Sequence, residues 1–564
     1  MPFSTSRGRM SLLGLVIVLP FLFAYTLGPA TNMLPLLFGL GCTGVLLLLS
    51  PAGALRRGSN WVLLALPFVL QLHSLLIAPA DTGLVAGAAL ALLAFWAVAQ
   101  AAAGWQAQQK ANWLWGAVLV AALLNSLICL LQYQGRVGVL SPWVHPGNPV
   151  RVFGNLRQPN QMATLSAMGF AILLLYAPRW TMNAQRHRSG LKTATALAAL
   201  VLLAFACAAT RSRTGLLQWL GVWGVACLWA WRGRAPKAVA LWATVGLLLY
   251  GLWAWGLAHD WSASISGATT TTGQAIPIDA LTRLENASQD ARTVLWNNVW
   301  QATAQQPGLG WGWGNLGWGL LNTPLQGRVF AAPLDNAHNL PLHLAVELGW
   351  PLALLFCAAV GYWVWRRQPW QTATPQQQSA WLVLAAIGLH SLLEYPLWHA
   401  PFLLAAALAF GVLATATTPI TRTCINRPRI LGLLLLALSL AFTADWLRAA
   451  QVYLNPEQRL DFFSDHPDWF DKAHSSSWFS KYTEFAQLST TELTADNAAQ
   501  ELARAQRLLH YSSEVRVLRR ASDAAALLGN PSLAAHYQTL LKRRWPQAPR
   551  PQQPQPLPAQ ASDH

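Results

Sequence analysis

The chain has 564 residues, of which 54% are hydrophobic and 10% are charged, and its formal net charge is +17 at pH 7. A soluble protein of this length needs far more charged side chains to cover its surface, so the composition excludes an ordinary soluble globular protein. The excess of Lys and Arg does not call for a nucleic-acid partner, because the loops of a membrane protein account for it.

Long apolar runs follow one another from residue 11 to about residue 448. A run of roughly 18 or more apolar residues crosses a bilayer as a helix, since a helix satisfies its own backbone hydrogen bonds in hydrocarbon. The sequence therefore predicts an all-α, polytopic membrane bundle of about thirteen transmembrane helices. These lie near residues 11–27, 33–50, 61–78, 82–103, 112–132, 159–177, 192–209, 214–231, 237–258, 341–364, 379–397, 400–417 and 430–448. The first run has no clear cleavage site and is expected to be retained.

The loops between these predicted helices alternate in charge, which predicts their orientation. One set of loops carries the basic residues Arg7, Arg9, Arg56, Arg57, Lys110, Arg179, Arg186, Arg188, Arg232, Arg234, Lys237, Arg366, Arg367, Arg422, Arg427 and Arg429. The positive-inside rule places this set in the cytoplasm. With an odd number of spans, the large loop 259–340 and the chain after residue 449 then lie outside.

Arginines also occur on the predicted outer side, where few are expected, and this favours an anionic ligand there. The stretch RVFGNLRQPNQ (151–161) has Gln158 at the cap of the sixth span. The stretch TRSRTG (210–215) places Arg211 and Arg213 at the start of the eighth.

The remaining polar stretches lie in and after the large loop. In ARTVLWNNVW (291–300), Arg292 and apolar residues repeat at helical spacing, so the apolar face is expected to rest on the membrane surface. The stretch LDNAHNLPLHLAVELGWP (334–351) crowds polar residues at the edge of the tenth span, and HSLLEYPLWH (390–399) joins it at the outer end of the eleventh. The polar residues of interest are Asn336, His338, Asn339, Glu347 and Tyr395.

Simpler interpretations of these residues stay open. An arginine at a helix end often only extends to the lipid headgroups. His343 and Glu347 lie four residues apart, as do His390 and Glu394, and the simpler interpretation is that the two members of each pair bind each other within the bundle.

The combination nevertheless suits one chemistry. Guanidinium groups bind phosphate oxygens through planar pairs of donors, and an imidazole can take a proton from an attacking hydroxyl. A diphosphate whose charge is already compensated can leave without a metal ion. No paired-carboxylate DxD motif is present, and the six cysteines have no metal-ligand spacing, so neither a metal site, a cofactor nor a disulfide framework is expected.

The stretches GNLRQPNQ, SRTG, ARTVLW, DNAHNLPLHLAVELG and HSLLEYPLW, in this order, resemble bacterial protein O-oligosaccharyltransferases of the O-antigen ligase and polymerase superfamily. The resemblance covers residues from about 30 to 448. It implies a multi-pass protein of the bacterial inner membrane whose active site and C-terminal domain face the periplasm. It further implies en bloc transfer of an oligosaccharide from an undecaprenyl-diphosphate carrier to Ser or Thr hydroxyls of a secreted protein such as pilin, by inverting-type displacement.

The resemblance also implies roles for individual residues. His338 matches the essential histidine, expected to be the general base. Arg213 and Arg292 match the diphosphate-binding arginines, with Arg211 as a weaker neighbour. Gln158 and Tyr395 match residues important in the protein-modifying branch, and positioning roles are expected for Asn336, Asn339 and Glu347.

The expected domain organisation has three parts. Residues 1–448 form the transmembrane glycosyltransferase region with its catalytic loop at 259–340. Residues 449–548 form a helical domain resembling tetratricopeptide hairpins, in which 497–511 and 530–545 have apolar residues at helical spacing. Residues 549–564 are Pro/Gln-rich and expected to be disordered.

Three other functions share some of these features. An O-antigen ligase uses the same donor and delivers the glycan to lipid A core, and a polymerase joins repeat units. A lipid-linked sugar transporter makes no bond. It is disfavoured because the ionisable groups gather at one face and no internal repeat is evident.

Overall fold

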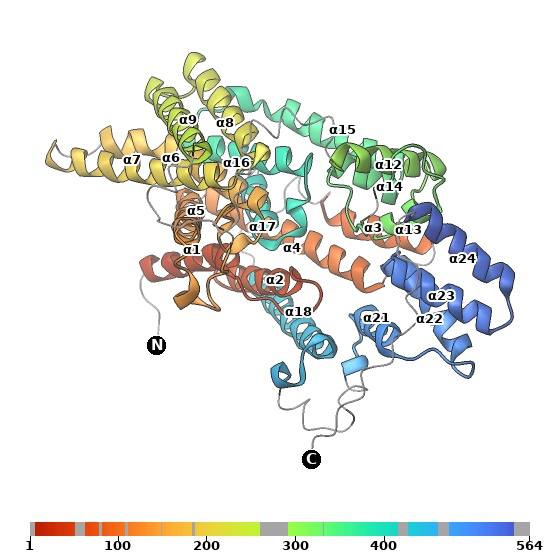
Figure 1. The fold of residues 1–564 in the computed structure, drawn as a ribbon. Helices are drawn as coiled ribbons and strands as arrows, with labels where there is room; N and C mark the ends of the chain where they lie inside the picture. The colour runs from red at the N-terminus through yellow and green to blue at the C-terminus, as the bar shows by residue number, and fades with distance from the viewer. Residues whose placement is uncertain are drawn as a thin grey trace.

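The structure, a computed structural model, describes residues 6–50, 63–77, 82–107, 111–147, 149–182, 186–259, 291–330, 332–414, 427–460, 468 and 473–545. The predicted disordered tail and most of the first half of the large loop lie outside these residues. The described residues form helices and no strands, in agreement with the predicted all-α class (Figure 1).

The helices of the predicted membrane region are, in chain order, α1 (Ser6–Leu22), α2 (Met33–Leu48), α3 (Ala65–Leu76), α4 (Thr82–Ala107), α5 (Asn112–Tyr133), α6 (Pro159–Met182), α7 (Arg186–Ala209), α8 (Arg213–Trp231), α9 (Lys237–Ala258), α12 (Ala291–Gln305), α13 (Leu316–Asn322), α14 (Leu340–Leu348), α15 (Trp350–Arg367), α16 (Pro375–Ser391), α17 (Ala400–Leu413) and α18 (Arg427–Ala450). The C-terminal helices are α21 (Ser480–Thr490), α22 (Ala498–Tyr511), α23 (Val515–Leu527) and α24 (Pro531–Arg544). Short 3-10 turns include η3 (Gly154–Leu156) and η6 (Pro396–Trp398).

Six helices of the described chain are long and apolar enough to cross a membrane. They are Gly83–Gln106, Asn112–Tyr133, Pro159–Arg179, Gly190–Ala209, Lys237–Ala258 and Pro428–Tyr453, and four shorter apolar helices accompany them. Every predicted span contains a helix. The chain is thus a helical protein with membrane-type segments, whereas the number thirteen stays a prediction.

The tenth predicted span, 341–364, is wrong as a single helix. The chain breaks at Gly349, which has a φ of 83° and separates α14 from α15. A Cβ at this position would lie 2.2 Å from the carbonyl oxygen of Gly308. Because the loop before α13 approaches this position so closely, only a residue without a side chain fits there, and glycine also adopts the positive φ readily.

Helix α6 lies at the centre of the bundle and is buried along its whole apolar length. Helices α5, α7, α8, α9 and α16 pack around it. Small residues permit close approach: a Cβ on Gly169 would lie 2.7 Å from the Cβ of Ala122, and one on Gly215 would lie 2.8 Å from that of Ala163. The first turn of α6 consequently lies in the middle of one end of the bundle.

Connections predicted to share the outer side meet at that end. Asn155 Nδ2 donates to the carbonyl of Leu22 at 2.8 Å, and Arg157 Nη1 donates to that of Thr31 at 3.1 Å. These bonds join the α5–α6 connection to the α1–α2 connection.

Connections predicted to be cytoplasmic meet at the opposite end. Arg9 Nε donates to the carbonyl of Leu49 at 2.7 Å, and Trp229 Nε1 donates to that of Pro369 at 2.9 Å. The alternation of connections between two ends agrees with the predicted topology, while the side of the membrane that each end faces stays a prediction.

The sequence predicted that the apolar face of α12 rests on the membrane surface, and this prediction is wrong. Leu295 and Val299 are buried in one cluster with Leu316 of α13 and Val346 of α14. Their side chains are covered by protein, so they cannot contact lipid, and only Trp300 of the predicted face is exposed. The apolar repeat instead fixes α12, and with it Arg292, to the loop that carries His338.

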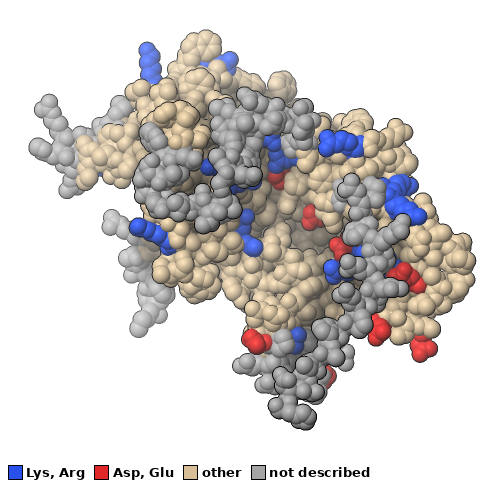
Figure 2. All heavy atoms as spheres, in the orientation of Figure 1, with Lys and Arg blue, Asp and Glu red and all other residues tan. Residues whose placement is uncertain are grey.

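The C-terminal helices form a separate small core that docks on α13 (Figure 1). Leu321 of α13 belongs to this core, and the Trp318 and His510 rings lie 4.2 Å apart. The predicted helices at 497–511 and 530–545 are confirmed as α22 and α24, with α23 between them. Figure 2 shows a largely uncharged surface over the bundle, with the acidic side chains of this face mostly around a central hollow and over the C-terminal helices.

Candidate active site

Glu394 connects several of the stretches that the sequence singled out. It lies in the connection 392–399 between α16 and α17, and its side chain is 8% exposed. Its Oε1 accepts hydrogen bonds from Arg292 Nη2 and, at 3.0 Å, from Asn160 Nδ2. Its Oε2 lies 2.6 Å from His338 Nδ1. One carboxylate therefore joins α12, the first turn of α6 and the segment before α14.

The electrostatics of this cluster keep Glu394 ionised. Burial alone would raise the pKa of the Glu394 carboxyl, but the hydrogen bond and charge of His338 and the charge of Arg292 outweigh it and lower the pKa to about 2. An ionised carboxylate has no proton to donate, so the hydrogen between it and His338 belongs to Nδ1. In a neutral imidazole this leaves Nε2 with a free lone pair, the form that a general base needs.

The backbone before α14 holds His338 in an unusual conformation. His338 has a φ of 51°, and its N–H donates to Asn336 Oδ1 at 2.9 Å. Asn339 caps α14 by accepting from the N–H of Leu342 at 3.0 Å, and its Nδ2 donates to the carbonyl of Leu392 at 3.1 Å. A left-handed residue between two bonded asparagines is a strained feature typical of functional sites.

Tyr395 forms one wall beside the imidazole. Its ring meets the His338 ring edge-on, with centroids 5.0 Å apart and an interplanar angle of 83°. Burial raises the pKa of the Tyr395 hydroxyl to about 12, so this hydroxyl stays protonated at neutral pH. Tyr395 can therefore orient the imidazole and donate a hydrogen bond, but it cannot act as a base.

The start of α8 joins the cluster through Asn160. Ser212 Oγ donates to Asn160 Oδ1 at 2.6 Å and accepts from the N–H of Gly215 at 3.2 Å, which makes Ser212 the cap of the helix. Arg213 follows as the first residue of α8, and Arg211 precedes the cap with a φ of 51°. The two arginines thus flank a residue that is hydrogen-bonded into the Glu394 network.

Two other predicted residues have local structural roles. Gln158 Oε1 accepts from the N–H of Gln161 at 2.9 Å at the start of α6, as the predicted cap requires. Glu347 is buried in α14, where its Oε2 accepts from the N–H of Gly314 at 3.0 Å and lies 3.5 Å from His343 Nε2. The interpretation of His343 and Glu347 as a mutual pair is confirmed.

The analogous interpretation of His390 and Glu394 is wrong. Helix α16 ends at Ser391, so Glu394 has left the helix and its carboxylate turns to His338 and Arg292. His390 Nδ1 instead lies 2.8 Å from Thr164 Oγ1. The sequence also gave no role to Asn160 or Ser212. The available signal for Glu394 was its position: it is a polar residue shortly after the end of a helix, at the start of the EYPLW stretch.

The described residues contain no group of three or more His, Cys, Asp or Glu side chains arranged to hold a metal ion. What this part of the chain does present is the imidazole of His338 oriented by the carboxylate of Glu394, which also binds the guanidinium of Arg292. Such an arrangement can deprotonate a hydroxyl and compensate the charge of an anionic leaving group.

The residues of the candidate site fall within regions that match models of known protein families. A family model described as O-antigen ligase matches residues 198–357, and one described as protein glycosylation ligase matches residues 152–176. A third, described as the C-terminal part of a virulence factor membrane-bound polymerase, matches residues 378–555. The three matches together contain every residue of the cluster around Glu394.

A curated relative, the general O-oligosaccharyltransferase of Acinetobacter baylyi, is 27% identical over 337 residues. The match covers 57% of this chain and 54% of the relative, so the chain spans about half the length of the relative that it matches. The resemblance to the O-antigen ligase superfamily and to its protein-glycosylating branch is therefore confirmed.

Proposed function

Because the chain is related to O-antigen ligases and protein glycosylation ligases, we propose that it is a glycosyltransferase that acts as a protein O-oligosaccharyltransferase. In this proposal it moves an oligosaccharide en bloc from an undecaprenyl-diphosphate carrier to a Ser or Thr hydroxyl of a secreted protein such as pilin, on the periplasmic face of the inner membrane. The contact of His338 with Glu394, and of Glu394 with Arg292, is the observation that carries it.

The acceptor hydroxyl is activated by His338. Nδ1 is held by the Glu394 carboxylate, so Nε2 takes the hydroxyl proton as the oxygen attacks the anomeric carbon of the sugar. Glu394 stabilises the imidazolium that results, without itself taking the proton. Removal of the donor's diphosphate from the opposite face inverts the anomeric configuration.

The leaving group is bound by arginines. As the bond between the anomeric carbon and the phosphate oxygen breaks, the electron pair and the developing charge pass to the diphosphate. Arg292, whose Nη2 donates to Glu394, places a positive charge beside the site where the diphosphate leaves. Arg213 and Arg211, at the start of α8, provide additional positive charge, and the proton held by His338 passes to solvent to complete the cycle.

Reconstitution tests the reaction. The purified protein in lipid nanodiscs is supplied with undecaprenyl-diphosphate-linked glycan and pilin, and the pilin is weighed by mass spectrometry. We expect a mass increase with the wild type, none with His338→Ala, and a normal increase with His536→Ala, which changes an exposed histidine of α24. Full glycosylation by His338→Ala would refute the general-base assignment.

An O-antigen ligase is the second candidate, because the residues that match the O-antigen ligase model, 198–357, include Arg213, Arg292 and His338. Its reaction would use the same donor and deliver the glycan to a lipid A core sugar. Offering pilin and lipid A core together in the same reconstitution decides between the two. Transfer to lipid A core alone would overturn the protein-modifying assignment while leaving the chemistry intact.

A further inference from the structure

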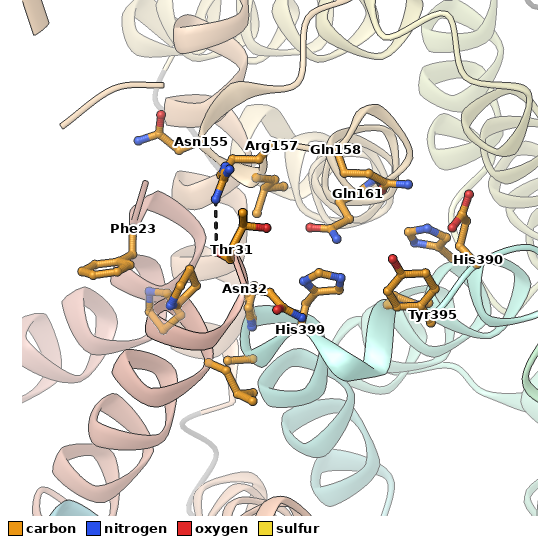
Figure 3. A pocket seen from close by; sticks show the side chains of 18 residues that line it. Phe23, Thr31, Asn32, Asn155, Arg157, Gln158, Gln161, His390, Tyr395 and His399 are labelled. Atoms are coloured by element: carbon orange, nitrogen blue, oxygen red, sulfur yellow. Dashed lines mark hydrogen bonds between the residues drawn. The ribbon is translucent and has the colours of Figure 1, made fainter. Parts of the chain in front are cut away.

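A cavity of about 230 Å³ lies beside the candidate active site. It is bounded by the end of α1, the α1–α2 connection, the first turn of α6 and the connection 392–399, and Glu394 and Tyr395 form part of its wall (Figure 3). The volume is far larger than the ~30 Å³ that one water occupies and smaller than the roughly 300–1,000 Å³ of sites for drug-sized ligands. The cavity therefore suits one ring-sized group.

The wall contains polar side chains whose hydrogen-bonding capacity is unused within the described chain. Gln161 is 5% exposed, and its side-chain amide has no hydrogen bond to any described residue. His390 is 1% exposed and its Nε2 has no partner, and the buried Nε of Arg157 has none either. His390 Nε2 and Arg157 Nε are covered by protein, so the amide of Gln161 is the unused polar group that a ligand in the cavity can reach, and it points to a polar ligand.

The chemical character of these groups is that of a site for neutral hydroxyl groups. An amide, a phenol and a neutral imidazole each offer both donors and acceptors, as a hydroxyl does. Burial lowers the pKa of His399 to about 4, so its imidazole is neutral at pH 7. Figure 3 shows the Gln161, His399 and Tyr395 side chains pointing toward one another across the cavity.

Aromatic rings provide the remaining wall. The His399 ring stacks on that of Tyr395, with centroids 5.7 Å apart, and Phe23 lines the far side. A sugar ring has the same mixed character, with apolar C–H faces that pack on rings and hydroxyls around its edge. An extended peptide would instead need backbone partners along a groove, whereas the described wall of this partly open cavity offers mainly side chains.

We infer that this cavity binds the pyranose ring that carries the diphosphate, and that Gln161 and His399 determine which first sugar the enzyme accepts. The inference rests on the proposed function. The position of Glu394, shared by the cavity wall and the contacts to His338 and Arg292, carries the assignment. A ring held here has its anomeric carbon at the border between the general base and the cationic groups, where the bond is exchanged.

The test compares undecaprenyl-diphosphate donors that carry a single sugar: N-acetylglucosamine, glucose or 2-deoxyglucose. Transfer to pilin is measured for the wild type, Gln161→Leu, His399→Phe and His399→Gln, with Gln134→Leu, on the exposed end of α5, as the matched control. We expect the donor KM to rise roughly tenfold in Gln161→Leu and His399→Phe, the loss expected from one hydrogen bond. Discrimination between glucose and 2-deoxyglucose should shrink in the same two variants.

Four readouts separate a binding site from a structural effect. His399→Gln keeps a donor and an acceptor and should retain most of the donor affinity, the control variant should match the wild type, the acceptor KM should not move, and each variant should elute as the wild type does in size-exclusion chromatography. Unchanged donor KM and sugar discrimination in active Gln161→Leu and His399→Phe would overturn the inference. A raised acceptor KM would also overturn it, because the cavity would then belong to the acceptor. If the wild type transfers none of the donors to pilin, the proposed function fails instead.

Discussion

Replacing Glu394 with glutamine tests the centre of the candidate site. Glutamine keeps the shape of the side chain but removes the charge, and when its amide oxygen accepts from Arg292 and Asn160, its NH2 group faces His338 and cannot accept from Nδ1. The imidazole then loses the partner that fixes its hydrogen on Nδ1. We expect kcat for glycan transfer to fall by about 10²–10⁴, the range that general-base catalysis provides.

The magnitude of the electrostatic contribution follows from the pKa of Glu394. Its displacement from 4.5 to about 2 corresponds to on the order of 3 kcal/mol of folded-state stabilisation. A carboxyl whose pKa is lower in the folded than in the unfolded protein stabilises the fold above pH 4.5, and this contribution is lost as the pH falls through about 2. The difference in Tm between wild type and Glu394→Gln should therefore shrink as the pH falls below about 4.5.

The assay is the nanodisc reconstitution with single-turnover kinetics, together with Tm measured by intrinsic tryptophan fluorescence. Glu492→Gln, which changes an exposed glutamate of the C-terminal domain, is the matched control and should resemble the wild type in both. Wild-type kcat in a folded Glu394→Gln protein would refute the reasoning, because the carboxylate would then neither orient nor stabilise the imidazole.

Three further predictions address the surroundings. Arg213→Ala should raise the donor KM more than Arg213→Lys does, because lysine keeps the charge without the planar donors; equal effects would leave Arg213 as a membrane anchor. Asn160→Leu removes the bridge between Ser212 and Glu394 and should reduce kcat roughly tenfold with little change in acceptor KM; a change confined to acceptor KM would contradict this role. Gly349→Ala places a Cβ 2.2 Å from the carbonyl oxygen of Gly308 at a φ of 83°, so Tm should fall by several degrees for a loss of about 1–3 kcal/mol, and an unchanged Tm would show that the loop can move aside.

The sequence by itself determined the helical segments and the residues that meet at one end of the bundle. Apolar runs of membrane length leave the backbone no alternative to helices, and helices of similar length return their connections to the same two ends. This is why GNLRQPNQ, SRTG, DNAHN and EYPLW, which are far apart in the chain, lie within one hydrogen-bonded network around Glu394.

The tertiary structure alone decided which side chains are partners. Spacing predicted that Glu394 pairs with His390, but the helix ends before Glu394, and the partners of a side chain outside a helix depend on what packs beside it. The apolar face of α12 likewise identified a buried surface without showing whether protein or lipid covers it. The break at Gly349 depends on its close contact with Gly308, which reaches Gly349 only when the chain folds. Periodicity reports the local conformation of a chain, whereas the choice of partner arises from contacts that exist only in the folded protein.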